Sequence, residues 1–401
     1  SEPEKHGTSP VNAFVDYKVL TKTDKPCFAA RDFFVRRRYR DFVWLRGQLC
    51  VSHPGCIVPP LPVVDSLLKD DRFSEAFIAQ RQAGLELFLR RIAGHAKLSD
   101  AAELQTFLEA KVWELETVKN ASHASWFSTI FDGTEASFKR VQSTFRQKVP
   151  DEAAIEKLRN FAANYSAVVS TAANKHHGAV RTLADIGSDL RQLGPALDML
   201  SQSETELSLP FTHMAATLER LRDLHLNQVQ SEHVSGLSAL LAFNAGMASA
   251  LKEVLANRDA SLIAYQKAAA SLEARTQERQ KWHAHLREPQ AEPPRRGMFA
   301  ALEEMVNGKG DETKKSHAMD CKVSEGEKEL SVAKERWEDI SLSIHTEVAA
   351  FHRSTNADFS RGLRAHIAEQ LAFQEAQQQQ WQQLLRVFEQ IETVPCGLTQ
   401  R

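Results

Sequence analysis

The sequence lacks a long apolar run, an excess of charge of either sign and a regular set of cysteines. No hydrophobic stretch approaches the ~20 residues that span a bilayer. No signal-peptide pattern opens it, and its start at Ser1 is compatible with loss of an N-terminal part. The formal net charge of -2 gives no argument for nucleic acid as a partner. Five irregularly spaced cysteines are typical of reduced cytosolic thiols.

Signatures of catalysis and of metal binding are also missing. The sequence contains no P-loop, no G-x-S-x-G, no H-E-x-x-H and no paired C-x-x-C motif. Cys50, His53 and Cys56 follow a C-x-x-H-x-x-C spacing, but no fourth ligand stands nearby in the sequence. We therefore expect no enzyme, no resident metal and no cofactor.

What the sequence does contain divides into two parts. Residues 1–10 are polar, and we expect a flexible tail there. Residues 11–21 alternate with a period of two, and residues 27–38 have strand-like composition, so both segments predict β-strands. Apolar periodicity predicts helices over 39–49, 73–92 and 98–115. These elements indicate a small α+β domain over residues 11–118, followed by a linker over 119–150.

The second part, residues 151–395, shows little β signal and few glycines or prolines. We expect three long helices over 151–206, 210–286 and 318–394, with a tail over 396–401. Their apolar stripes, such as Leu218 and Leu221 or Ile340 and Ile344, need a partner. A long coiled-coil bundle or a dimer would supply it.

One short segment carries a pattern typical of phosphate recognition. A strand-like run delivers Arg36, Arg37, Arg38 and Tyr39 to the start of a helix, and the stiff stretch 59–62 (Pro-Pro-Leu-Pro) follows. Arginine offers fork-shaped donors that match phosphate oxygens. A tyrosine face can pack on a sugar-like ring. Asp41 fits a structural cap or an arginine partner better than a catalyst.

Three motifs together resemble a known family. They are Arg-Arg-Tyr-x-Asp-Phe at residues 37–42, the proline stretch 59–62, and Phe-Ile-x-x-Arg-x-x-Gly-Leu at residues 77–85. They resemble the phox-homology (PX) domain, a phosphoinositide reader. Long helices behind such a domain resemble the PX-BAR sorting nexins. The resemblance implies a three-stranded sheet with a helical subdomain, followed by an all-α BAR domain of three antiparallel helices that forms a dimeric coiled-coil bundle.

The resemblance also implies residue roles. Arg38 would hold the 3-phosphate of phosphatidylinositol 3-phosphate, Tyr39 would stack on the inositol ring, and Arg81 would bond the far hydroxyls. The family usually carries a lysine for the 1-phosphate just after the proline stretch. Val63 and Val64 stand there in this sequence, and Lys69 is the nearest cation.

Two further segments have two interpretations each. Residues 125–148 carry a wide apolar stripe at helical spacing with basic residues beside it, which fits either a helix that inserts into the membrane interface or one packed on the bundle. Its candidate membrane-inserting residues are Trp126, Phe127, Ile130, Phe131 and Phe138. The Lys175-His176-His177 triplet fits either a basic patch on the membrane face or a solvated helical turn.

The family resemblance implies a peripheral membrane protein on the cytosolic face of early endosomes. It would bind phosphatidylinositol 3-phosphate and anionic membrane, sense or induce curvature, and act in retrograde or recycling transport of cargo. Expected partners are a second copy or another sorting nexin, with retromer as a further candidate and nucleic acid excluded. Two alternatives stay open: autophagy-linked sorting, and a helical protein-interaction scaffold with a degenerate PX domain.

Overall fold

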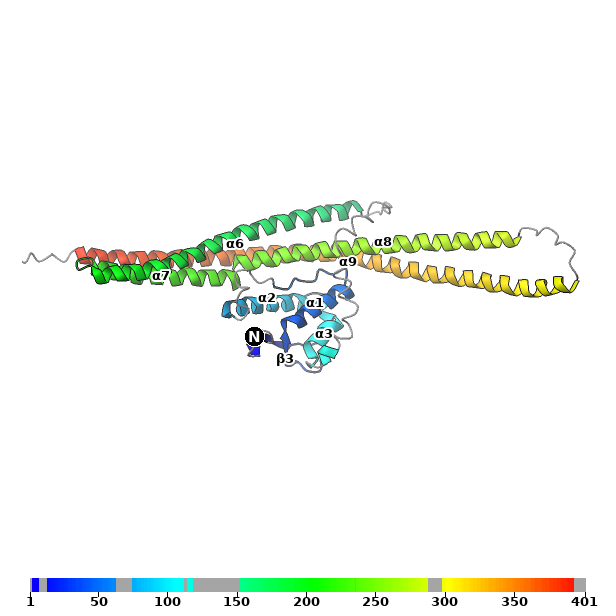
Figure 1. Ribbon diagram of the computed structural model, residues 1–401, viewed down its shortest axis with the longest axis horizontal. Coiled ribbons are helices and arrows are strands. Elements are labelled where there is room, and N and C mark those ends of the chain that lie inside the picture. The colour runs from blue at the N-terminus through cyan, green and yellow to red at the C-terminus, as the bar shows by residue number, and fades with distance from the viewer. Residues whose placement is uncertain are drawn as a thin grey trace, which may run out of the picture.

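The computed structural model describes residues 2–6, 13–62, 74–111, 114–117, 152–234, 236–287 and 298–392. Side chains are described for all of these except residues 285–287, 298–313 and 392. A small α+β domain lies against the middle of a long, narrow bundle of helices (Figure 1). The predicted fold class, an α+β domain followed by an all-α domain, is therefore confirmed.

The α+β domain contains one antiparallel sheet with strand order β1-β2-β3. Its strands are β1 (Pro3–His6), β2 (Phe14–Lys22) and β3 (Asp32–Arg38). The expectation of a flexible tail over residues 1–10 is wrong for Pro3–His6, which pairs with β2. Charged cross-strand contacts hold β1 in place: Lys18 Nζ lies 3.1 Å from Glu2 Oε2, and Arg36 lies 2.7 Å from Glu4 Oε2.

Helices cover this sheet and complete the core of the α+β domain. They are α1 (Tyr39–Ser52), α2 (Glu75–Ala93), the 3-10 helix η2 (Leu98–Asp100) and α3 (Ala102–Glu109). Phe42, Phe88 and Phe107 pack edge to face in the buried centre. The single helix expected over 98–115 is wrong, because the extended backbone of Ala101 separates η2 from α3.

The long helices are α6 (Glu152–Ser203), α7 (Ser208–Val234), α8 (Leu237–Arg287) and α9 (Met298–Glu392). Helices α7 and α8 lie end to end, and α9 runs antiparallel to both (Figure 1). The second predicted helix is thus interrupted near Gly236, although no proline marks the position. The third begins 20 residues earlier than the expected residue 318, because Gly308 and Gly310 continue the helix at a cost of about 1 kcal/mol each.

The apolar stripes of these helices bury one another within the chain. Ile155 of α6, Leu251 of α8 and Ile344 of α9 share one core, and each is at most 1% exposed. The region Ser208–Ala284 is long and apolar enough to cross a membrane by length and composition alone. Within it, residues 234–251 carry no Asp, Glu, Lys or Arg, so the expectation that no apolar stretch approaches the length of a membrane span is wrong. Burial of Leu251 identifies this run as a helix of the bundle core.

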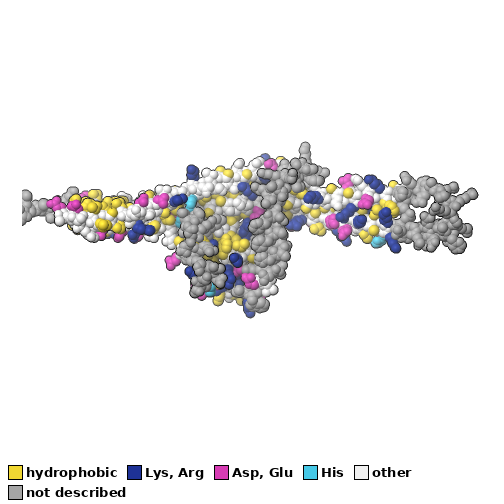
Figure 2. Space-filling model, viewed as in Figure 1, with side chains coloured by type: hydrophobic (Ala, Val, Ile, Leu, Met, Phe, Trp, Pro, Cys, Tyr) yellow, Lys and Arg dark blue, Asp and Glu magenta, His cyan; other side chains and the backbone are white. Residues whose placement is uncertain are grey.

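Other apolar side chains of the bundle stay exposed in the single chain. Leu363, Ile367 and Leu371 recur every four residues on α9, and Ile367 is 57% exposed. Such a spacing puts the three side chains on one face of the helix. Hydrophobic side chains are visible over the end of the bundle where α6, α7 and the C-terminal part of α9 meet (Figure 2). An exposed apolar stripe of this kind is typical of a surface that contacts another molecule.

Specific polar contacts fix the α+β domain on the bundle. Arg46 of α1 pairs with Glu253 of α8 at 2.9 Å, and Arg91 of α2 pairs with Asp358 of α9. Ile57 belongs to the bundle core rather than to the core of its own domain. The two domains therefore share buried apolar surface as well as ion pairs.

Candidate functional site

The junction of β3 and α1 presents the residues expected to read phosphate. Arg38 is the last residue of β3 and the N-cap of α1, with extended backbone angles. Its backbone N–H donates to Asp41 Oδ2 at 2.7 Å. The prediction that Asp41 is a structural cap is confirmed. The cap ends the strand and starts the helix at the arginine-tyrosine pair.

The three consecutive arginines have different environments. The Arg36 guanidinium bonds Asp16 Oδ1 at 2.6 Å and also pairs with Glu4. Arg37 is only 1% exposed, and its Nε donates to the Phe107 carbonyl at 2.7 Å. Burial lowers the pKa of Arg37. Arg38 is exposed and makes no ion pair with any residue that the structure describes. Of the three, Arg38 is the one whose guanidinium is available to an anion.

One aromatic ring contacts the Arg38 guanidinium, and two others contact that of Arg81. The Arg38 guanidinium carbon lies 3.6 Å from the centroid of the Phe14 ring. Arg81 of α2 lies 4.4 Å from the ring of Tyr39 and 4.3 Å from that of Phe77. Burial raises the pKa of the Tyr39 hydroxyl, against the opposing effect of Arg81. The contact between Arg81 and Tyr39 joins α2 to the residue that follows Arg38 in the chain.

Arg81 keeps part of its donor capacity unused. Its Nε is buried and has no hydrogen-bond partner within the described residues. Because Nε is enclosed, a ligand would have to bond the terminal guanidinium nitrogens of Arg81, whose side chain is half-buried. The structure thus brings together three of the four predicted lipid-binding residues, while Lys69, together with Val63 and Val64, lies outside the described part of the chain.

Two glycines position the proline stretch that follows α1. A Cβ atom on Gly84 would lie 2.3 Å from Pro62, and one on Gly246 would lie 2.6 Å from Pro60. The first glycine belongs to α2 and the second to α8, so the stretch is clamped between its own domain and the bundle. The position of the proline stretch is therefore fixed by both domains. The predicted membrane-inserting segment, from Trp126 to Phe138, lies outside the described residues.

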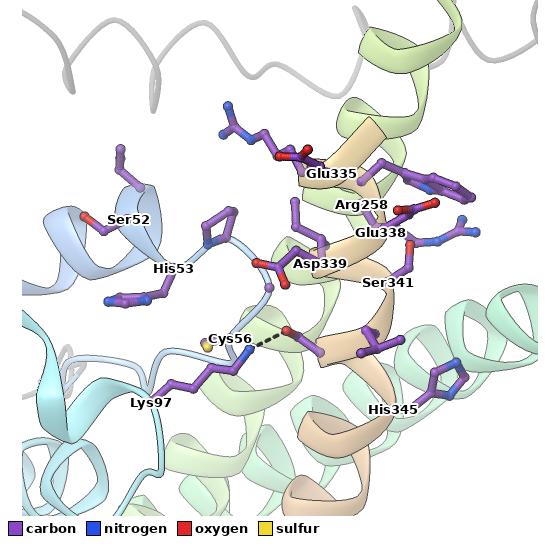
Figure 3. A pocket seen from close by; sticks show the side chains of 18 of the residues that line it. Ser52, His53, Cys56, Lys97, Arg258, Glu335, Glu338, Asp339, Ser341 and His345 are labelled. Carbon is purple, nitrogen blue, oxygen red and sulfur yellow. Dashed lines mark hydrogen bonds between the residues drawn. The ribbon is translucent and has the colours of Figure 1, made fainter. Parts of the chain in front are cut away.

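A cavity of about 1280 Å³ opens where the α+β domain meets the bundle. Its walls come from the end of α1 and from α9, with Arg258 of α8 beside them (Figure 3). Lys97 reaches across it and donates to Ser343 Oγ at 2.7 Å. Charges of both signs line it, including Lys97, Arg258, Glu338 and Asp339, and none of Arg38, Tyr39 and Arg81 is among them. The cavity is thus separate from the candidate phosphate site.

Beside the cavity, Cys56, His95 and Glu347 converge from distant parts of the sequence. Glu347 Oε2 accepts from the backbone N–H of Ile57 at 2.9 Å and lies 3.0 Å from His95 Nε2. Backbone N–H groups of Lys97 and Leu98 both donate to His95 Nδ1 at 3.2 Å. The proton of a neutral ring must then sit on Nε2, which donates to Glu347. The group is therefore a structural hydrogen-bond cluster between the two domains.

This burial predicts a pattern of thiol reactivity. Burial raises the pKa of Cys56 to about 11 and that of Cys50 to about 12, whereas Cys27 and Cys321 are exposed. At pH 8 only about one Cys56 in a thousand would be a thiolate, the form that reacts. We expect N-ethylmaleimide to label Cys27 and Cys321 within minutes and to spare Cys50 and Cys56 until urea is added. Mass spectrometry of peptides measures this, and fast labelling of Cys56 in the native chain would contradict the docked arrangement.

Comparisons with known proteins agree with this architecture. The PX domain family model matches residues 25–111. Human sorting nexin-7 is 30% identical over 245 residues, which are 60% of this chain and 59% of that protein. Sorting nexin-4 of Cryptococcus neoformans is 25% identical over 97% of this chain and 80% of its own length. Human sorting nexin-1 is 26% identical over 96% of this chain and 70% of its own length.

A solved structure has the same fold over nearly the whole chain. A chain of the SNX-BAR Mvp1 tetramer, determined by cryo-EM, superposes with a TM-score of 0.56 at 15% sequence identity, and the match covers 96% of this chain and 98% of that one. The α+β domain is thus a PX domain, and the helical bundle has the SNX-BAR form. Over nearly its whole length the chain is thus similar to PX-BAR sorting nexins. The match to sorting nexin-7 spans about three fifths of that relative's length.

Proposed function

We propose that this chain is a peripheral membrane protein that recognises a 3-phosphorylated phosphoinositide. Arg38 holds the 3-phosphate, Tyr39 packs on the inositol ring, and Arg81 bonds the far hydroxyls. The observation that carries the proposal is the exposed guanidinium of Arg38, which makes no ion pair within the described residues, whereas Arg36 and Arg37 before it both have structural partners. A charge kept out of ion pairs at the mouth of a helix is poised for an anionic ligand. Lys69 would supply the further cation for the 1-phosphate.

The proposed active form is a dimer through the exposed face of α9. Leu363, Ile367 and Leu371 form an apolar stripe on a helix of 95 residues. A second copy of the chain would cover this stripe with the same surface, as expected for a two-fold interface. Another sorting nexin is the alternative partner. Two PX domains on one dimer would then bind one membrane together, which raises the effective affinity without any new contact.

The cellular role that we propose is endosomal sorting. The chain would act on the cytosolic face of early endosomes, sense or induce curvature through the bundle, and serve retrograde or recycling transport with retromer as a candidate partner. Autophagy-linked sorting is the second candidate pathway. No catalytic step enters this role, in line with the absence of catalytic motifs in the sequence.

A different class of function rests on one observation. Val63 and Val64 replace the lysine that the family usually carries, which favours a degenerate PX domain on a protein-interaction scaffold. Co-sedimentation with liposomes that contain or lack phosphatidylinositol 3-phosphate separates the two proposals. We expect strong pelleting only with the 3-phosphate lipid present. Equal pelleting with both kinds of liposome, or none with either, would favour the scaffold.

The segment between the two domains predicts a separate effect on membrane shape. Phe127 and Phe131 would insert into the leaflet, and each would contribute about 1.5–3 kcal/mol to the free energy of membrane insertion if fully buried. Phe127→Glu with Phe131→Glu should abolish liposome tubulation in electron micrographs while dimerisation is retained. Phe127→Leu with Phe131→Leu is the matched control and should still tubulate. Tubules formed equally well by the Glu variant would mean that the segment packs on the bundle.

A further inference from the structure

The break between α7 and α8 holds a buried carboxylate. Glu232 lies in the last turn of α7 and is only 1% exposed. A Cβ atom on Gly236 would lie 2.4 Å from Glu232 Oε2, so glycine leaves room for the carboxylate at the break. The backbone N–H of Ser238, in the first turn of α8, donates to the same oxygen at 3.4 Å. A carboxylate this deeply buried requires partners that compensate its charge.

Two histidines from other helices provide these partners. His176 of α6 places Nε2 3.1 Å from Glu232 Oε2, and His366 of α9 places Nδ1 2.9 Å from Glu232 Oε1. The imidazole rings are nearly perpendicular, with centroids 5.5 Å apart. The histidine side chains are 17% and 18% exposed, so solvent reaches the edge of the group. The interpretations of His176 as part of a basic patch or of a solvated turn are both wrong, because it faces the bundle interior.

The hydrogen bonding of this group is incomplete. His366 Nδ1 is buried and makes no hydrogen bond within the described residues, although Glu232 Oε1 is close to it. Its contact with Glu232 Oε1 is therefore close but is not a formed hydrogen bond, and a metal ion placed between the two atoms would replace this contact. The nitrogens of His176 and His366 and a carboxylate oxygen of Glu232 lie within 4.8 Å of one another. Ligand atoms of a tetrahedral zinc ion are about 3.3 Å apart, so small rotations of the side chains would admit the ion.

We propose that His176, Glu232 and His366 form a zinc-binding site that ties α6, α7 and α9 together at the helix break. Two imidazoles and one carboxylate are a ligand set that zinc accepts readily. Three protein ligands leave the fourth position to water, which the partial exposure of the histidines allows. Gln370, whose amide nitrogen lies 3.5 Å from Glu232 Oε1, would orient the carboxylate from outside.

Two other groups of metal-ligating residues do not carry the same inference. In the cluster of Cys56, His95 and Glu347, backbone donors occupy His95 Nδ1, so Nε2 carries a proton and offers no lone pair. The third group surrounds Asp16 on the sheet, where Arg36 already neutralises the carboxylate at 2.6 Å. Only the bundle site combines a buried carboxylate with a ring nitrogen that has no hydrogen bond, within the described residues.

Titration of the full chain with zinc, after removal of metals with EDTA, tests the proposal. We expect one zinc ion per chain, and a rise in melting temperature when the ion binds. His176→Gln combined with His366→Gln should weaken binding by at least about 100-fold and remove the thermal shift, because first ligands matter more than outer partners. His345→Gln, an exposed position on α9, is the matched control and should bind zinc as the unchanged chain does.

Cobalt reports the type of ligand and the coordination geometry without any variant. Co²⁺ at the proposed site should give the visible bands of a tetrahedral nitrogen and oxygen site, without the near-ultraviolet band of thiolate ligation. This readout stands even if the double variant is too unstable to purify. A chain that takes up no zinc, a thiolate band, or unchanged zinc affinity in a folded double variant would each overturn the proposal. None of these outcomes depends on lipid, so they leave the proposed membrane function to its own tests.

Discussion

Replacement of Arg38 by alanine is expected to lower the affinity of the chain for liposomes containing phosphatidylinositol 3-phosphate by at least about tenfold. Hydrogen bonds to charged groups are worth about 1.5–3 kcal/mol each, and a guanidinium can make two of them to one phosphate. The side chain is exposed and lies outside the core, so the fold should be unchanged. Co-sedimentation over a range of lipid concentrations measures the affinity, and circular dichroism checks the fold.

Arg40→Ala is the matched control for this experiment. Arg40 is also exposed, lies two residues away and carries the same charge. A general attraction between cations and an anionic membrane would make the two variants equally weak. Site-specific recognition requires Arg38→Ala to lose far more than Arg40→Ala. If the Arg38 variant pellets as well as the unchanged chain does, the assignment of the phosphate site is wrong.

Replacement of Ile367 by glutamate should convert the proposed dimer to a monomer. The unchanged chain should scatter light as a particle of about twice 45.0 kDa. Ile367 is 57% exposed in the single chain, so a carboxylate costs little there until a partner covers it. Within a two-fold interface the substitution buries charges on both chains, and an unpaired buried charge costs several kcal/mol. Light scattering at micromolar concentration should therefore report a mass near 45.0 kDa.

Leu342→Glu provides the control on the same helix. Leu342 is 78% exposed but lies near the α+β domain, away from the stripe of Ile367. This variant should remain a dimer. A dimeric Ile367→Glu chain would place the interface elsewhere, and an unchanged chain that is monomeric would contradict the dimer itself.

Local patterns predicted the parts of the fold that depend on residues close to one another in the sequence. The arginine-tyrosine pair, the cap at Asp41 and the proline stretch are close in sequence, and their roles follow from the chemistry of each residue type. The long helices were also predictable, because their apolar residues recur at helical spacing over many turns. In contrast, β1 has the sequence Pro-Glu-Lys-His, without alternation. Its position depends on ion pairs to β2 and β3 that no local pattern reveals.

The contacts between distant residues could not be predicted in this way. His176 and His366 are 190 residues apart, and only the packing of α6 against α7 and α9 brings them to Glu232. One signal was present in the sequence. His225, Gln228 and Glu232 interrupt the apolar stripe of α7 at helical spacing, and all three are buried. Polar residues at core positions of a long helix indicate a buried polar network, even when their partners are unknown.

The most direct test of the lipid site needs no membrane. Isothermal titration of the full chain with a water-soluble short-chain phosphatidylinositol 3-phosphate measures head-group recognition alone, apart from dimer avidity and membrane insertion. Our account predicts one head group per chain, weaker binding of the matching 4-phosphate, and loss of binding in Arg38→Ala. Equal heats with the 3-phosphate and the 4-phosphate, or no heat with either, would contradict recognition of the 3-phosphate by Arg38, Tyr39 and Arg81.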